Sequence, residues 1–107
     1  MGTWLSKYTE LKTLIDEALS IGQQAADKTD DVGTANLDKV VICGLKGVRE
    51  STLKNAGINC YKHWSYAGAF IISRSYGQGD KNTVGIEAAK DYLKSKGVDC
   101  YVHSRMD

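Results

Sequence analysis

The sequence contains no proline, a single phenylalanine and no long apolar run. No run approaches the roughly 18 residues that span a bilayer, and the N-terminus does not show the basic and apolar segments of a secretory signal. An excess of one charge is also missing, because 14 basic residues face 13 acidic ones and the net charge is +1. These absences argue against a membrane protein, a strongly basic nucleic-acid binder and an acidic nucleic-acid mimic.

Cysteines are few, and they form no recognisable metal-binding or redox motif. Cys43, Cys60 and Cys100 are an odd number of widely spaced thiols without a CxxC pair, so we expect no metal site, no disulfide framework and no cofactor. Reduced, buried thiols predict a cytoplasmic protein. One targeting pattern is present by letter, since Met1-Gly2-x-x-x-Ser6 fits N-myristoylation. The alternative is that Gly2 only precedes a helix.

The residues that are present fit one globular domain over residues 1–107. An apolar content of 42% with 25% charged residues is ordinary for such a domain. The charges are unevenly distributed, because residues 1–38 hold three basic and seven acidic residues while residues 39–107 hold eleven and six. An acidic front therefore precedes a basic body.

Periodicity divides the chain into an N-terminal amphipathic helix over residues 4–26, a polar linker over 27–37 and a body over 38–104. The helix places apolar side chains at spacings of three and four. In the body, the pattern predicts strands at 38–43, 58–64, 69–73 and 98–103, with helices at 47–56 and 83–96. A hairpin connection is expected at 65–68 and a glycine-containing loop at 75–82.

An internal repeat specifies the fold. Residues 53–63 (Leu-Lys-x-x-Gly-Ile-Asn-Cys-Tyr-x-His) return 40 positions later at residues 93–103 (Leu-Lys-x-x-Gly-Val-Asp-Cys-Tyr-x-His). Each copy covers a helix end, a glycine stop and the following strand. Two β-α-β units joined by a hairpin resemble the ferredoxin-like split-βαβ arrangement, an α+β fold. We therefore expect a four-stranded antiparallel sheet with the first and third strands at its centre and both repeat helices on one face.

Alternation along the expected edge strands assigns their faces. The cysteines point toward the helices, and the outward positions carry two matching Tyr-x-His pairs: Tyr61, His63, Tyr101 and His103. On opposite edges of the sheet, the two histidines are expected to lie too far apart to share a metal ion.

The expected central strands are apolar on both faces, so the helix-free face also needs a cover. The N-terminal helix is the leading candidate. The alternatives are a bound ligand and a second copy of the chain, in a homodimer formed through that helix or through the open face.

A binding surface is the main functional hypothesis. Its candidate residues are Tyr61, His63, Phe70, Tyr76, Lys81, Tyr101 and His103. No nucleophile elbow, HExxH motif, paired catalytic carboxylates or Cys/His dyad is recognisable, so we expect no enzyme activity. The leading function is an intracellular protein-binding module that acts by steric docking. In size and fold class it is similar to phage-encoded inhibitors of bacterial defence systems, anti-CRISPR proteins among them.

A second hypothesis is a binder of single-stranded RNA. The segment Val40-Val-Ile-Cys-Gly-Leu45 resembles the shorter signature of the RNA-recognition motif, and Ala69-Phe70-Ile71 resembles part of the longer one. Of the stacking rings that the family uses, Phe70 is kept, whereas Val41 and Gly68 replace two others.

A third hypothesis is an enzyme acting on phosphate esters. The segment Gly44-Leu-Lys-Gly-Val-Arg49 leads into an expected helix N-terminus, where backbone N–H groups favour an anion. It resembles the phosphate loop of acylphosphatases, and the resemblance implies anion binding by Lys46 and Arg49.

Overall fold

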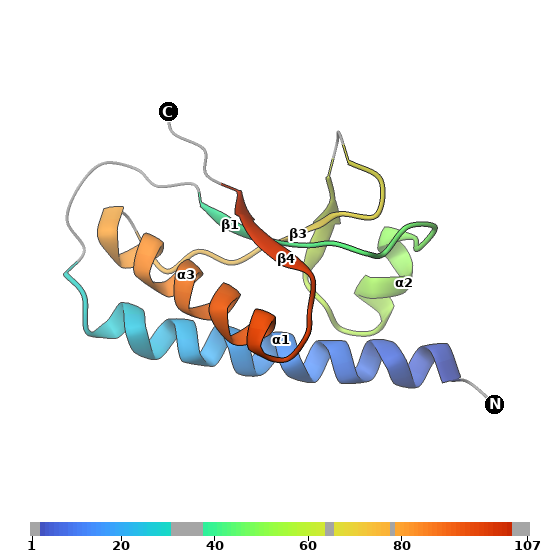
Figure 1. The fold of residues 1–107 in the computed structure, drawn as a ribbon, viewed down its shortest axis with the longest axis horizontal. Helices are drawn as coiled ribbons and strands as arrows, with labels where there is room; N and C mark the ends of the chain where they lie inside the picture. The colour runs from blue at the N-terminus through green and yellow to red at the C-terminus, as the bar shows by residue number, and fades with distance from the viewer. Residues whose placement is uncertain (1–2, 31–37, 64–65, 78, 104–107) are drawn as a thin grey trace.

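The structure, a computed structural model, describes residues 3–30, 38–63, 66–77 and 79–103. In chain order the elements are α1 (Thr3–Asp27), β1 (Lys39–Ile42), α2 (Glu50–Asn55), β2 (Cys60–Lys62), β3 (Phe70–Ile72), α3 (Gly79–Ser95) and β4 (Cys100–His103). This is the predicted order of helices and strands (Figure 1). Gly2, residues 31–37 of the predicted linker and Ser65 of the predicted hairpin connection lie outside the described residues.

The four strands form one antiparallel sheet in the order β2-β3-β1-β4. The first and third strands are central and the other two are edges, as the repeat predicted. Val41 of β1 lies opposite Ile71 of β3 on one side and Tyr101 of β4 on the other. Ile71 in turn lies opposite Tyr61 of β2, so these four residues form one row across the sheet.

The internal repeat is a structural repeat. After α2, Gly57 has a φ of +93° and its N–H donates to Lys54 O, while Ile58 N–H donates to Leu53 O. After α3, Gly97 has a φ of +84°, and its N–H and that of Val98 donate to the equivalent carbonyls forty positions later. Both turns are Schellman motifs, in which glycine supplies the left-handed conformation.

The main core lies on one face of the sheet. It joins the helix-facing side chains of the strands, such as Ile42, Phe70 and Ile72, to residues of all three helices. α2 contributes Leu53 and α3 contributes the equivalent Leu93, each only 1% exposed. Both repeat helices therefore cover the same face, as expected.

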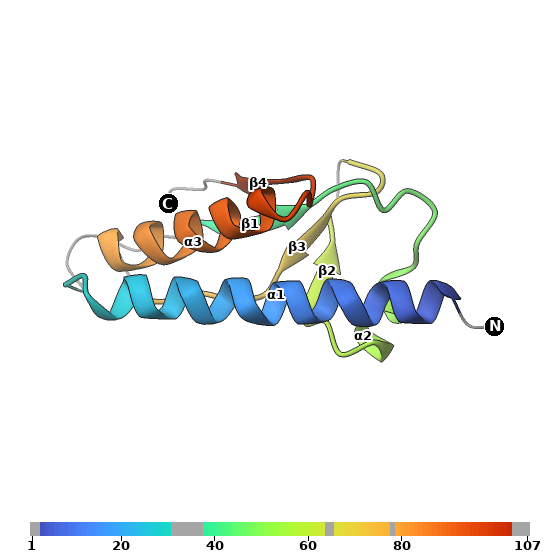
Figure 2. The same cartoon turned by 60° about the horizontal axis from the view of Figure 1, so that its bottom comes forward.

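The predicted placement of the N-terminal helix over the opposite face is wrong. α1 runs antiparallel beside α3, on the same side of the sheet (Figures 1 and 2). The reason is the length of α2, which has six residues against seventeen in α3 and begins at Glu50 rather than near residue 47. So short a helix leaves part of the helix-facing side open, and Leu11 and Ile15 of α1 pack there.

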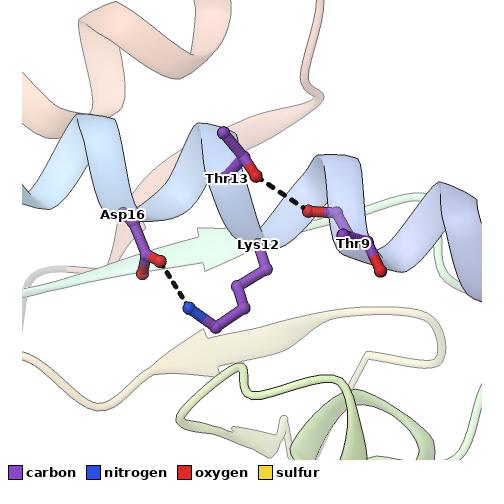
Figure 3. Close-up of polar contacts among 4 residues, drawn as sticks. All are labelled: Thr9, Lys12, Thr13 and Asp16. Atoms are coloured by element: carbon purple, nitrogen blue, oxygen red, sulfur yellow. Dashed lines mark hydrogen bonds and ion pairs between the residues drawn. The ribbon is translucent and has the colours of Figure 1, made fainter.

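α1 also covers the turn after α2. The Lys12 side chain pairs with the Asp16 carboxylate one turn along, and the Thr13 hydroxyl donates to Thr9 O at 3.1 Å (Figure 3). The aliphatic part of Lys12 lies so close to Gly57 that a Cβ at that position would be 2.5 Å from Lys12 Cε. The positive φ of Gly57 therefore requires glycine, while the end of the Lys12 side chain would have to move to admit a larger residue.

α1 and α3 meet around Tyr76, in the segment between β3 and α3. The Tyr76 hydroxyl donates to Leu19 O at 2.8 Å. A Cβ on Gly22 or Gly85 would lie 2.5 Å or 2.4 Å from Tyr76 atoms, so the ring is enclosed by two glycines from different helices. Among the described helices, none is long and apolar enough to cross a membrane.

Candidate functional site

The face opposite the helices carries a second, smaller apolar cluster. Val41, Ala69 and Ile71 form it, and Cys43 and Tyr101 pack at its border. We call this the helix-free face, because the described helices all pack into the other core. Strand alternation explains it, since residues with these odd numbers point away from the helices.

An open hollow of about 600 Å³ lies on this face. We call it the aromatic hollow; its described lining residues are Cys43, His63, Tyr66, Ala67, Ala69, Tyr101 and His103. They come from the end of β1, the β2–β3 connection, the start of β3 and from β4. The described lining contains four ring-bearing side chains and no Lys, Arg, Asp or Glu.

The two histidines meet in this hollow, contrary to prediction. The His63 and His103 rings are 5.8 Å apart between centroids and nearly perpendicular, although the residues belong to opposite edges of the sheet. His63 pairs with Ala69 near one corner, and His103 pairs with Lys39 near the diagonal one. Twist raises diagonal corners of a sheet toward one side, which shortens this distance. Over the described ranges, no group of three His, Cys, Asp or Glu residues is placed to hold a metal ion.

Contacts with neighbouring residues fix the position of His63. It is 5% exposed, its backbone N–H donates to Ala69 O at 2.9 Å, and its Nδ1 accepts from the backbone N–H of Tyr66 at 3.3 Å. The Tyr66 ring lies 4.8 Å from the imidazole. The β2–β3 connection therefore fixes the orientation of one wall of the hollow.

The tyrosines occupy the edges of the helix-free face. Tyr61 and Tyr66 are 39% and 61% exposed, which makes them two of the most exposed large hydrophobic residues described. Tyr101 is half-buried, and burial, with smaller effects of Cys43 and Tyr66, raises its pKa. Its hydroxyl therefore stays protonated at neutral pH and remains a hydrogen-bond donor.

Phe70 and Tyr76 are not on the binding surface, and their prediction is wrong. Phe70 is 1% exposed in the helix-side core, because alternation in β3 turns residues 70 and 72 toward the helices. Tyr76 is 5% exposed between α1 and α3, and burial raises its pKa to about 12. Both rings stabilise the fold.

Lys81 also lies elsewhere than predicted. α3 begins at Gly79, not near residue 83, so Lys81 belongs to the first turn of this helix rather than to a loop. Asn82 lies within the helix, is wholly buried and bonds to Tyr76 and Asp38, so its side chain does not cap the helix. Lys81 is therefore on the helix side of the sheet, away from the aromatic hollow.

The predicted anion site does not form around Lys46 and Arg49. Both are exposed, and Arg49 precedes α2 in an extended conformation. The helix that follows is only six residues long and opens with Glu50, whose carboxylate accepts from Lys62 N–H at 2.7 Å. A negative charge already occupies the helix start, which disfavours phosphate there.

The thiols are poorly suited to nucleophilic chemistry. Burial raises the pKa of Cys60 to about 11 and also raises the pKa values of Cys43 and Cys100. At Cys43, which lines the hollow, the negative charge of Asp99 raises the thiol pKa further. Only the thiolate attacks well, so these cysteines pack as small apolar groups at neutral pH.

Of the predicted surface residues, the hollow brings together His63, Tyr101 and His103, and Tyr61 lies beside it in the same row as Ile71. Sequence reasoning did not assign Cys43, Tyr66, Ala67 or Ala69 to this surface. The available signal for Tyr66 was its place in a hairpin connection that begins two residues after His63.

In a comparison with known proteins, the chain matches no protein-family model, no curated protein and no solved structure.

Proposed function

We propose that this chain is a non-enzymatic binding module that docks on a partner protein through its helix-free face. The observation that carries the proposal is the aromatic hollow, together with the exposed rings of Tyr61 and Tyr66, on a face that the described helices leave uncovered. Water over the exposed Tyr61 and Tyr66 rings is released when a partner covers them, whereas Val41 and Ile71 are already buried, each 0% exposed. Tyrosine is enriched at such interfaces, whose centres carry few charged residues.

The arrangement of the face favours a protein partner over a nucleic-acid partner. An RNA-recognition sheet stacks bases on rings of its central strands, whereas the central row here holds Val41 and Ile71, and Phe70 faces the other way. Phosphate binding depends on Lys and Arg, and none of the described residues that line the hollow is either. An enzyme of acylphosphatase type is less favoured still, because Lys46 and Arg49 are exposed and Glu50 stands beside them.

We infer further that the fold is ferredoxin-like. The order β2-β3-β1-β4, with the first and third strands at the centre, supports this proposal, and the paired Schellman turns support a duplicated unit. The long α1 beside α3 and the short α2 are the departures from a symmetric pair of units.

The test compares variants of one face with a matched control. The immobilised full chain is used to purify its partner from cells that express it, and the dissociation constant is then measured with both proteins pure. Because tyrosines are enriched among interface hot spots, Tyr61→Ala with Tyr101→Ala should weaken binding by about thirty-fold or more. Val84→Ala, at a 37% exposed position on α3, should leave binding unchanged.

Salt dependence separates the two partner classes. Binding to a protein through the hollow, whose described lining has no Lys, Arg, Asp or Glu, should change little between about 50 and 200 mM salt. Tight binding to single-stranded RNA that weakens by orders of magnitude over this range, with loss in Lys81→Ala, would contradict the proposal.

A further inference from the structure

The aromatic hollow has a continuous wall of rings. Tyr66 stacks at a tilt on His63, with centroids 4.8 Å apart and planes at 43°, and His63 meets the edge of His103. Tyr101 lines the same hollow from β4. These rings offer both faces and edges, which are the two geometries in which aromatic groups attract one another.

Small side chains also line the hollow. They are Cys43, Ala67 and Ala69, and the volume of about 600 Å³ is within the roughly 300–1,000 Å³ typical of small-molecule pockets, which is large enough for an aromatic side chain. His63 is fixed by its contacts with Tyr66 and Ala69, so this wall is already in place before anything binds. A preformed pocket loses little conformational freedom on binding.

The charge of the hollow restricts its occupant. Since the described lining has no ionisable group of fixed charge, a lysine, arginine or carboxylate that entered it would lose hydration without gaining a counter-charge. An uncharged ring keeps its favourable contacts and has little hydration to lose. The Tyr66 and Tyr101 hydroxyls can form a hydrogen bond with a polar atom of the bound ring.

We infer that the aromatic hollow is the anchor pocket of the docking face and takes an uncharged aromatic side chain, tryptophan or tyrosine, of the partner protein. The inference rests on the proposed function and names the chemistry of its central contact. The exposed rings of Tyr61 and Tyr66 then form the surrounding contact, which excludes water from the anchor.

The first test uses side-chain fragments as probes and needs no partner. Indole, p-cresol, methylcyclohexane and n-butylammonium are titrated separately into the ¹⁵N-labelled full chain. Indole and p-cresol should give saturable shifts at the amides of Cys43, Ala69 and Tyr101. n-Butylammonium should give none, and methylcyclohexane should bind at least several-fold more weakly than indole. Equal binding of the alkane or the ammonium ion, or no saturation at these amides, would overturn the inference.

The second test fills the hollow. Ala67 is an exposed lining residue, so Ala67→Trp should fold normally and occupy the space from within, whereas Lys94→Trp adds the same ring at an exposed position on α3. We expect Ala67→Trp to abolish indole binding and to weaken partner binding about thirty-fold. Tyr66→Ala removes one wall without filling the hollow, and it should weaken both kinds of binding.

The outcomes distinguish the two proposals. If Ala67→Trp loses indole but keeps full partner binding, the anchor inference fails and the docking face stands. If the partner is also insensitive to Tyr61→Ala with Tyr101→Ala, the proposed function itself fails. A dimer of the unmodified chain in sedimentation, abolished by Ala67→Trp, would overturn the inference in favour of a second copy as the occupant.

Discussion

At the scale of single residues, Asn82 joins the start of α3 to the segment just before it and to a residue far away in the sequence. Its Oδ1 accepts from Tyr76 N–H at 2.9 Å, and its Nδ2 donates to Asp38 O at 3.2 Å. The side chain is wholly buried in the first turns of α3. It therefore fixes the entry to α3 against the residue before β1.

Replacing Asn82 should lower the stability of the protein. Asn82→Ala removes a buried acceptor and a buried donor at once, and we expect the free energy of unfolding to fall by about 2 kcal/mol. The measurement is urea unfolding monitored by circular dichroism. Asn59→Ala, at an exposed asparagine, is the control and should change stability by less than about 0.5 kcal/mol. Equal stability of the two variants would show that the buried amide contributes nothing specific.

At the scale of elements, the contact of α1 with α3 depends on the absence of a methyl group. A Cβ on Gly85 would meet the Tyr76 ring at 2.4 to 3.0 Å, too close for any side chain without displacement of the ring. Glycine inside a helix is otherwise unfavourable relative to alanine by about 1 kcal/mol. The close packing of the helices around Tyr76 must outweigh that cost.

A double-mutant cycle tests this contact. Gly85→Ala alone should destabilise the protein by about 1 to 3 kcal/mol, because the methyl overpacks the site. In a Tyr76→Ala background the same substitution should be neutral or stabilising by up to about 1 kcal/mol, since the ring is gone and alanine favours the helix. Thermal and urea unfolding of the four proteins give the coupling energy. Additive effects would contradict the proposed clash.

The edge strand β2 is shielded by a carboxylate from α2. Glu50 accepts from Lys62 N–H and pairs with Lys54 at 3.3 Å, and these contacts, the backbone one first, lower its pKa. A charged side chain over a strand edge also blocks pairing with another chain.

The lowered pKa of Glu50 predicts how this shield responds to pH. The stabilisation is fully present above the pKa of an unperturbed carboxyl, about 4.3, and is lost as pH falls through the lower pKa of the folded state. Hydrogen-exchange protection of the Lys62 amide should therefore drop at low pH, while the backbone-paired His63 amide keeps its protection. Glu50→Gln should lower Lys62 protection at neutral pH. Unchanged protection in this variant would mean that the contact does not persist in solution.

The elements also show which features the sequence could predict. Period-two alternation assigned Cys60 and Cys100 to the helix side and Tyr61 and Tyr101 to the opposite face, and the repeat located both glycine helix stops and the central strands, because these patterns depend on local geometry. The side taken by α1 could not be predicted, since both faces of the central strands are apolar and the outcome depends on how much of one face α2 covers. The meeting of His63 and His103 depends on sheet twist, which strand register alone does not give.

At the scale of the whole molecule, α1 is part of the single helix-side core and not an appended arm. Ile15 and Ala18 are 4% and 0% exposed, and α1 packs against side chains of the sheet, of α3 and of the turn after α2. A fully buried aliphatic side chain contributes about 1.5–3 kcal/mol, and a small domain has only about 5–15 kcal/mol in total. Loss of the whole helix therefore exceeds what the remaining chain can absorb.

Deletion of residues 1–30 should accordingly leave a chain that does not fold alone. Ile42, Phe70 and Ile72 would lose their cover, and we expect no cooperative thermal transition by circular dichroism, with aggregation in sedimentation. A peptide of residues 3–30 added in trans should restore the transition, because the missing contacts are non-covalent. As a milder counterpart, Ile15→Ala should cost about 2–5 kcal/mol, while Glu10→Ala at an exposed position of the same helix should cost far less. A cooperative melt of residues 31–107 alone would instead identify the sheet with α2 and α3 as an independent unit, with α1 free to leave it.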